Sequence, residues 1–379
     1  MTTGVWLYPW DVRDIPELPA LLSDSRLDTV CLAGSYHSLQ AAVPGNATRR
    51  VFELSGTATY FTPDETLWRD QLLRPAVSPL VSELGDVFDY GRRFADQAGV
   101  TLTGWLVCMH SGDLVRQHPE LAVEMATGDI ALSAPCLLAD EVRDYAVSLV
   151  RDVAGRVDAI QLESLHWMAQ PHARHMKIDG AAPRLSRLAT SVCFCQRCRG
   201  FAGERGVDAE AVAKALLAAW GSAWDGLSPD DPAGVDGLTP YLDLRAEIVT
   251  SLIAEIVAAV SVPVEVVRFG DAVLNGVDTR AVEQLGVSVR VLEYGTADRV
   301  AAGLEALKAA PDSPGELHVG VSLLPEHAAD LADARRGVEA AAVSGAESVR
   351  IYHLGLAGAR RRAWLPSLLD TWHAEKTIS

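Results

Sequence analysis

Short apolar runs alternate with longer amphipathic segments along the chain. The short runs are rich in β-branched residues and end on polar or aromatic residues, which is typical of buried strands in a parallel sheet. The longer segments place apolar residues three and four positions apart, which favours helices. The predicted strands are residues 4–8, 29–33, 101–107, 158–162, 263–267, 287–292, 317–321 and 348–352. The predicted helices include residues 141–153, 209–219, 242–260, 297–309 and 328–342.

This alternation predicts an α/β fold, a (β/α)8 TIM barrel formed by a single domain over residues 1–379. The alternative fold is an open α/β sheet, but no Gly-rich phosphate-binding motif follows an early strand. Two connections are too long for a plain barrel. We expect these insertions, residues 35–82 and 163–262, to cover the barrel mouth.

The composition narrows the class of protein and its partners. Hydrophobic residues make up 49% of the chain, which is enough for a large core. The net charge of −17 argues against a nucleic-acid partner, because binding to phosphates needs clustered Lys and Arg. No apolar run reaches the ~20 residues of a membrane span, so no membrane partner is expected. The amino terminus lacks a secretory signal pattern, which predicts a cytoplasmic protein. The sequence is compatible with a homo-oligomer and leaves the oligomeric state open.

Two predicted strands end on a carboxylate. Glu163 follows the strand at 158–162, and Glu293 follows the strand at 287–292. Active sites of TIM barrels lie at the carboxyl ends of the strands, so we expect both side chains at one mouth. Two carboxylates that flank one bond are what glycosidic hydrolysis needs. The alternative is that each forms a salt bridge at the rim, for example with Arg268.

Other polar and aromatic residues also follow the predicted strands. We expect these side chains to bind a small carbohydrate or glycoside, through hydrogen bonds to its hydroxyls and stacking on its ring. The alternatives are histidines that bond to backbone carbonyls and tryptophans that belong to the core. The predicted substrate-binding residues are Tyr36, His37, Trp105, His110, His166, Trp167, Arg268, Asp271, Tyr294 and His353.

The cysteines form the most specific short motif. Cys193, Cys195 and Cys198 lie within six residues of one another, and Cys136 lies upstream. Four thiolates are the ligand set of many structural zinc sites, so a structural zinc is the predicted cofactor. The alternatives are free thiols in a reducing compartment or a site that has lost its metal. No organic cofactor is expected.

The stretch from residue 134 to 199 resembles family 42 β-galactosidases, and the chain as a whole resembles glycoside-hydrolase barrels of clan A. The resemblance rests on Glu163 and on the spacing of Cys136, Cys193, Cys195 and Cys198. It implies that Glu163 is the acid/base and that the four cysteines bind zinc. Those enzymes have Asn-Glu where this chain has Leu162-Glu163, and they take their nucleophile from strand seven. Here the seventh predicted strand leads into Ser322 and Leu323, so Glu293 is the predicted second carboxylate.

The sequence therefore predicts a glycoside hydrolase, or a related enzyme that cleaves glycosidic bonds, with Glu163 as acid/base and Glu293 as second carboxylate. One alternative is a metal-dependent sugar isomerase or epimerase with Glu163, Glu293, Asp271 and a histidine as metal ligands. Another is a carbohydrate-binding barrel without catalytic activity.

Overall fold

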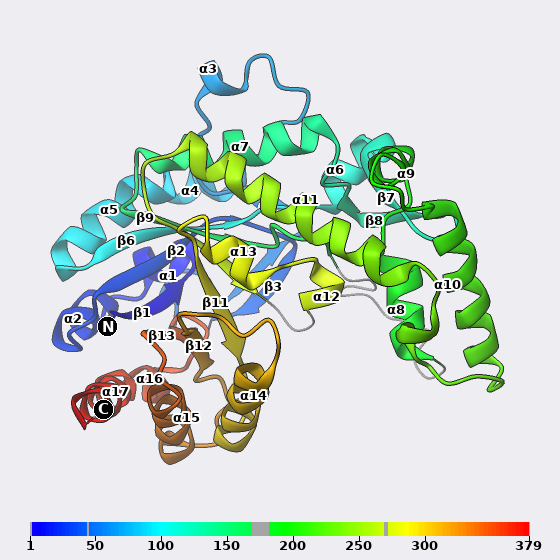
Figure 1. Ribbon diagram of the computed structural model, residues 1–379. Helices are drawn as coiled ribbons and strands as arrows, with labels where there is room; N and C mark the ends of the chain where they lie inside the picture. Colours follow the sequence, from blue (N-terminus) through cyan, green and yellow to red (C-terminus); the bar gives the residue numbers. More distant parts are fainter. Residues whose placement is uncertain (1, 44, 169–181, 269–271, 379) are drawn as a thin grey trace.

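The computed structural model describes residues 2–43, 45–168, 182–268 and 272–378. Eight parallel strands close into a barrel, with β1 hydrogen-bonded to both β2 and β13 (Figure 1). The predicted TIM barrel and all eight predicted strands are confirmed. The barrel strands are β1 (Thr2–Leu7), β2 (Thr29–Tyr36), β6 (Thr101–Val107), β9 (Ala159–Glu163), β10 (Val264–Arg268), β11 (Ser288–Glu293), β12 (His318–Ser322) and β13 (Ser348–Tyr352).

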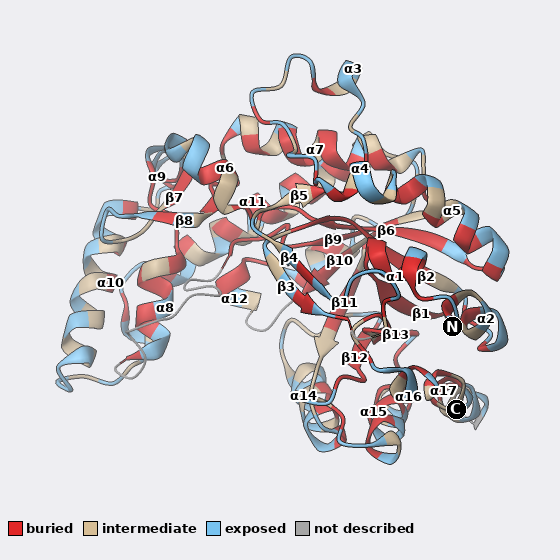
Figure 2. Cartoon of the chain, turned by 180° about the vertical axis from the view of Figure 1, so that it is seen from behind, coloured by how far each residue is buried: buried red, intermediate tan, exposed pale blue. Residues whose placement is uncertain are grey.

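Helices surround the barrel and bury their apolar faces against it (Figure 2). Each of the five predicted helices is present; the helix at 297–309 has the predicted bounds, and each of the other four has at least one shifted end. The helix predicted from residue 328 begins at Leu331, because the Asp330 side chain accepts a hydrogen bond from the backbone N–H of Asp333 and caps the helix there. The helices of this layer are α1 (Pro9–Asp14), α2 (Leu18–Asp24), α5 (Val87–Ala98), α7 (Asp140–Ala154), α11 (Leu238–Ala259), α12 (Ala272–Asn275), α13 (Thr279–Glu283), α14 (Ala297–Ala309), α15 (Leu331–Val343), α16 (Ala359–Arg362) and α17 (Leu365–Ile378).

Three connections at the carboxyl ends of the strands carry additional elements. Those after β2 are β3 (Leu39–Ala42), β4 (Val51–Leu54), β5 (Ala58–Thr59), α3 (Glu65–Trp68) and α4 (Leu80–Leu84). Those after β6 are α6 (Gly112–Gln117), the 3-10 helix Pro119–Leu121, β7 (Ala122–Glu124) and β8 (Ile130–Pro135). Those after β9 are α8 (Pro183–Ser191), α9 (Gln196–Gly203), α10 (Ala209–Trp224) and the 3-10 helix Pro232–Gly234.

Within the 163–262 segment, α8, α9 and α10 project from one side of the barrel, whereas α11 lies beside α7 in the outer layer (Figure 1). The antiparallel β7–β8 hairpin was not anticipated from the sequence. Its strands are short and only partly buried, so they lack the continuous apolar run of the barrel strands. None of the described helices is long and apolar enough to span a membrane.

The barrel interior contains a buried ionic cluster below the carboxyl ends of the strands. Glu265 forms ion pairs of 2.7 Å with both Arg290 and Arg350. Burial alone would raise the pKa of Glu265, but the two guanidinium groups outweigh it and hold that pKa well below its ordinary value. Gln161 donates a hydrogen bond to Glu265 and accepts one of 2.6 Å from the indole N–H of Trp6. The cluster is thereby linked through Gln161 to the next layer of side chains.

Candidate active site

A cavity of about 540 Å³ lies at the carboxyl ends of the barrel strands. Its lining comes from strand ends and from the loops that follow them, so it occupies the place where TIM barrels carry their active sites. The lining residues are Trp6, Tyr36, His37, Trp105, His110, Glu163, Ser164, His166, Met168, Val267, Asn275, Leu292, Tyr294, Leu324, Glu326, His327, Tyr352 and Leu356.

Glu163 is the buried carboxylate of this cavity. It is the last residue of β9, and only 8% of its surface is exposed. Its Oε2 atom accepts a 2.8 Å hydrogen bond from the indole N–H of Trp105. Burial raises the pKa of Glu163 to about 7, against the opposing effect of the Trp105 hydrogen bond. Glu163 therefore holds a proton over part of the neutral pH range, as a general acid must.

Aromatic rings form much of the cavity wall. Trp105 makes edge contacts with Trp6 and Tyr36, at ring-centre distances of 6.5 and 5.0 Å. Tyr294 stacks on Tyr352 at 5.1 Å. Burial raises the pKa of Tyr36, Tyr294 and Tyr352, so their hydroxyls stay protonated and can donate hydrogen bonds. The wall thus combines flat apolar faces with hydroxyl donors, a combination that suits a sugar ring.

Histidines from four loops also line the cavity. The rings of His37 and His110 lie 4.2 Å apart. His166 Nδ1 lies 3.0 Å from the backbone oxygen of Trp167, and His327 Nδ1 lies 2.8 Å from Ser322 Oγ. These contacts fix the orientation of His166 and His327 in the wall. Of the four histidines, the sequence analysis named His37, His110 and His166.

His353 does not reach the cavity. It is fully buried behind the wall, where it stacks on Tyr8 at 4.3 Å and its Nδ1 lies 3.7 Å from Asp11. Burial lowers the pKa of His353 to about 3. The predicted contact between His353 and a substrate is not supported, since other side chains separate the ring from the cavity.

Glu293 is not brought together with Glu163, contrary to the prediction. Successive strand residues point to opposite faces, and it is Leu292 that lines the cavity. The Glu293 carboxylate lies against α14, where a Cβ atom on Gly303 would collide with its Oε2. Burial raises the pKa of Glu293, while Arg268 and Arg299 oppose that shift. Glu293 therefore occupies the outer side of the barrel wall.

Arg268 and Trp167 are two further predicted binding residues that do not line the cavity. Arg268 points away from it and forms a 2.7 Å ion pair with Asp312. Trp167 is buried and donates a 3.2 Å hydrogen bond to the backbone oxygen of Arg245. Asp271 lies outside the described residues. The predicted residues that do line the cavity are Tyr36, His37, Trp105, His110, Glu163, His166 and Tyr294.

Glu326 is a second carboxylate in the lining, and the sequence analysis missed it. It is an exposed residue of the loop after β12, four positions beyond the end of that strand at Ser322. The hydrogen bond between Ser322 and His327 closes this loop and presents Glu326 at the cavity. A search of whole strand-end loops, rather than of the residues next to each strand, would have found it.

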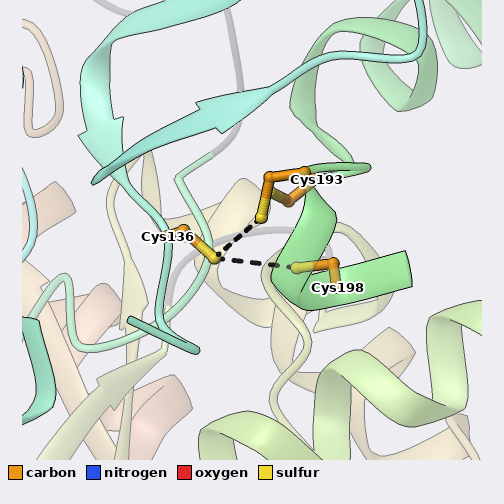
Figure 3. Close-up of side chains that lie close together, drawn as sticks. Cys136, Cys193 and Cys198 are labelled. Atoms are coloured by element: carbon orange, nitrogen blue, oxygen red, sulfur yellow. Dashed lines mark hydrogen bonds between the residues drawn. The ribbon is translucent and has the colours of Figure 1, made fainter. Parts of the chain in front are cut away.

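The four cysteines form a separate cluster, and Figure 3 shows three of them, Cys136, Cys193 and Cys198. Cys136 follows β8, Cys193 and Cys195 precede α9, and Cys198 lies in α9. All four are buried, and their sulfur atoms lie within 4.8 Å of one another. Cys136 Sγ is 3.6 Å from the sulfurs of both Cys195 and Cys198.

These distances suit a metal ion. A tetrahedral zinc with Zn–S bonds of ~2.3 Å separates its sulfur ligands by ~3.8 Å. Hydrogen bonds from the neighbouring thiols, Cys136 first, lower the pKa of Cys195, and the thiolate is the form that binds metals. No other group of three or more such ligands occurs in the described part of the chain. The buried four-cysteine cluster is therefore consistent with a metal site.

Comparisons with known proteins extend the fold assignment. No protein-family model and no curated protein matches the chain. One similar solved structure is α-L-fucosidase isoenzyme 2 from Paenibacillus thiaminolyticus, with 13% identity and a TM-score of 0.57. The alignment covers 100% of this chain and 50% of the fucosidase chain. Another is a β-N-acetylhexosaminidase from Bacteroides fragilis, with 10% identity and a TM-score of 0.50. The alignment covers 98% of this chain and 65% of the hexosaminidase chain. The chain thus spans half the length of the fucosidase, and it is a TIM barrel structurally similar to glycoside hydrolases.

Proposed function

We propose that the protein is a glycoside hydrolase in which Glu163 is the general acid. The observation that carries this proposal is the buried position of Glu163 in the cavity, where desolvation raises its pKa to about 7. A carboxylic acid that stays protonated near neutral pH is the acid that glycosidic cleavage requires. The structural similarity to a fucosidase and a hexosaminidase supports the same reaction class.

In the proposed reaction, Glu163 donates its proton to the glycosidic oxygen as the bond from that oxygen to the anomeric carbon breaks. The leaving group departs as an alcohol. A water molecule supplies the hydroxyl that ends on the anomeric carbon, and its second proton restores the acid form of the enzyme. The rings of Trp6 and Trp105 provide faces for the apolar side of the sugar, and the tyrosine hydroxyls donate to its oxygens.

Glu326 replaces Glu293 as the proposed second carboxylate. It lines the same cavity as Glu163, whereas Glu293 lies against α14. An ionised carboxylate at this position can stabilise the positive charge that develops on the sugar ring, as a nucleophile or as a base toward water. The loop after β12 would then carry the chemistry that the sequence analysis assigned to the end of β11.

We also propose that the cysteine cluster holds a structural zinc, as the resemblance to family 42 β-galactosidases implies. Four thiolates fill a tetrahedral site and leave no position for substrate. None of the four cysteines lines the cavity, so this metal would act on stability rather than on chemistry. It would tie the β7–β8 hairpin to α9.

The test is hydrolysis of a panel of 4-nitrophenyl glycosides, including fucosides, galactosides, glucosides and N-acetylhexosaminides. Glu163→Gln keeps the shape of the side chain but removes its proton donor, so we expect kcat/KM to fall by at least ~10²-fold. We expect a loss of similar size for Glu326→Gln. Glu293→Gln is the matched control, and its kcat/KM should stay within about twofold of wild type.

The outcomes separate the proposal from its rivals. A sugar isomerase or epimerase would convert free sugars and lose activity to a chelator. A carbohydrate-binding barrel would bind sugars with an affinity that depends on Glu163 and show no turnover. Turnover that is unchanged in Glu163→Gln would reject the proposed role of Glu163.

A further inference from the structure

We infer that the substrate is an oligosaccharide chain whose further sugar units occupy two cavities adjoining the active-site cavity. This inference rests on the proposed function, because it extends the site that Glu163 defines. The extension runs from His37 and His110 toward the β3–β4 hairpin.

The second cavity adjoins the first at two histidines. It has a volume of about 110 Å³ and shares both His37 and His110 with the active-site cavity. Its other lining residues are Ser38, next to His37, and residues of the loop after β4, of α6 and of β8. The two imidazole rings are in contact, with their centres 4.2 Å apart, and they form the border that both cavities share. A ligand that spans the two cavities would therefore pass across these rings rather than between them.

The second cavity presents polar groups that are already held in place. Asp113 and Arg116 form an ion pair there, with 31% and 50% of their side chains exposed. Asp113 also accepts a 2.9 Å hydrogen bond from the backbone N–H of Thr57, and the Thr57 hydroxyl donates one of 2.9 Å to the backbone oxygen of His110. These bonds join the loop after β4 to the segment that follows β6. The pair is thus ordered before any ligand arrives, which lowers the entropic cost of binding.

The chemistry of the second cavity matches a sugar unit. A carboxylate beside a guanidinium offers acceptors and donors to neighbouring hydroxyls, and hydrogen bonds to charged groups are the stronger kind. Leu132 lines the same cavity with 54% of its surface exposed, which gives the sugar ring an apolar face. Polar and apolar groups together on one wall favour a carbohydrate over a purely apolar leaving group.

A third cavity continues the path. It has a volume of about 340 Å³ and shares Ser55, Gly56, Thr57 and Asp113 with the second cavity. Arg49 and Glu83 line it, and they form a 2.7 Å ion pair of the same type as the Asp113–Arg116 pair. A single monosaccharide in the active-site cavity would leave both further cavities unused, whereas a chain of several units would fill them.

The experiment measures binding to Glu163→Gln protein, which keeps the site but does not cleave the ligand. Calorimetric titrations use β-1,4-linked gluco-, xylo-, manno- and chito-oligosaccharides, from the disaccharide to the pentasaccharide of each. In one of the four series, we expect the pentasaccharide to bind at least about 10-fold more tightly than the disaccharide, because each added unit makes further contacts. Adding Arg116→Ala should remove most of that gain. Arg335→Ala, on α15 at a distance from the cavities, is the matched control and should leave the gain intact.

Three outcomes would overturn the inference. These are affinity that does not depend on chain length, binding of none of the four series, and equal effects of Arg116→Ala and Arg335→Ala. If affinity did not depend on chain length but a nitrophenyl glycoside were cleaved in a Glu163-dependent way, the inference would be rejected and the proposed function would stand. If neither a nitrophenyl glycoside nor any of the four oligosaccharide series is cleaved in a Glu163-dependent way, the proposed function itself fails.

Discussion

The indole nitrogen of Trp105 donates a 2.8 Å hydrogen bond to Oε2 of Glu163. This bond favours the ionised carboxylate, while burial of the same group favours the protonated acid. The two effects set the pH range over which Glu163 can donate a proton. Trp105 therefore affects the protonation of the proposed acid, Glu163, and also forms part of the cavity wall.

Trp105→Phe tests this relationship. The substitution keeps an aromatic ring but removes the N–H donor, so the pKa of Glu163 should rise further. Since the acid must be protonated, the alkaline limb of the kcat/KM profile should move to higher pH by about one unit, the value of one charge-assisted hydrogen bond. The measurement is the pH–rate profile of the best nitrophenyl glycoside.

Trp6→Phe is the matched control for that profile. Trp6 also lines the cavity, but its N–H bonds to Gln161 rather than to Glu163. We expect its alkaline limb to stay at the wild-type pH. Equal shifts in the two variants, or a shift of Trp105→Phe toward lower pH, would show that the hydrogen bond does not set the pKa.

Glu163 should also reduce the stability of the folded protein at alkaline pH. Its folded pKa is about 7, against an ordinary value of 4.5, so the folded state binds more protons between these values and stability falls as pH rises through that window. The shift of about 2.5 pH units corresponds to roughly 3 kcal/mol. Glu163→Gln should therefore be more stable than wild type at pH 8, by an amount on that order.

Urea unfolding of both proteins at pH 4 and pH 8 checks this prediction. The comparison at pH 4 is the internal control. At that pH the Glu163 carboxyl is mostly protonated in both the folded and the unfolded state, so the two proteins should differ much less in free energy of unfolding. If the two proteins differed in free energy of unfolding by the same amount at both pH values, the substitution would act through packing rather than through the charge.

The cysteine cluster predicts one zinc ion per chain in protein purified without chelator. Cys198→Ser should lose the metal and lower the free energy of unfolding by several kcal/mol, because metal binding contributes directly to folding. Cys108→Ser is the control, since Cys108 is buried outside the cluster. Elemental analysis together with thermal unfolding gives both readouts. Metal-free protein with wild-type stability would assign the cluster to free thiols.

Glu265 should be essential for stability. Glu265→Gln leaves Arg290 and Arg350 buried without their shared carboxylate, and removing one partner of a buried ion pair costs about 3–5 kcal/mol. Because the pKa of Glu265 is held low, its contribution should be present above the ordinary value of 4.5 and decline as pH falls below it. Glu255→Gln breaks the ion pair of Glu255, whose side chain is half exposed, with Arg143. It should lower the free energy of unfolding by about 1 kcal/mol or less. Equal losses in urea unfolding at pH 7 would contradict this account.

The barrel could be predicted from sequence because its strands are buried on both faces and appear as continuous apolar runs. Glu163 could be predicted for the same reason, since a carboxylate stands out at the end of such a run. The run does not reveal which face its last residue occupies. Side chains alternate between the two faces of a strand. In β9 the last residue, Glu163, faces the cavity, whereas in β11 the residue before the last, Leu292, faces it and Glu293 faces α14.

Glu326 and the β7–β8 hairpin were missed for a different reason. Both belong to connections whose course is set by tertiary contacts, such as the hydrogen bond between His327 and Ser322, rather than by local apolar periodicity. The cysteine cluster was an exception among these connections. The spacing of Cys193, Cys195 and Cys198 is a ligand pattern in itself, and it pointed to the cluster without any knowledge of the path of the chain.

Gln161 and Glu163 are two residues apart on β9, so the same face of one short strand carries both the link to the ionic cluster and the proposed acid. A single inserted or deleted residue between Ala159 and Glu163 would turn one of the two outward. The strand is therefore expected to keep its length while the loops around it diverge. Changes in the connections after β2, β6 and β12 would alter the lining of the cavity while leaving Gln161 and Glu163 in place.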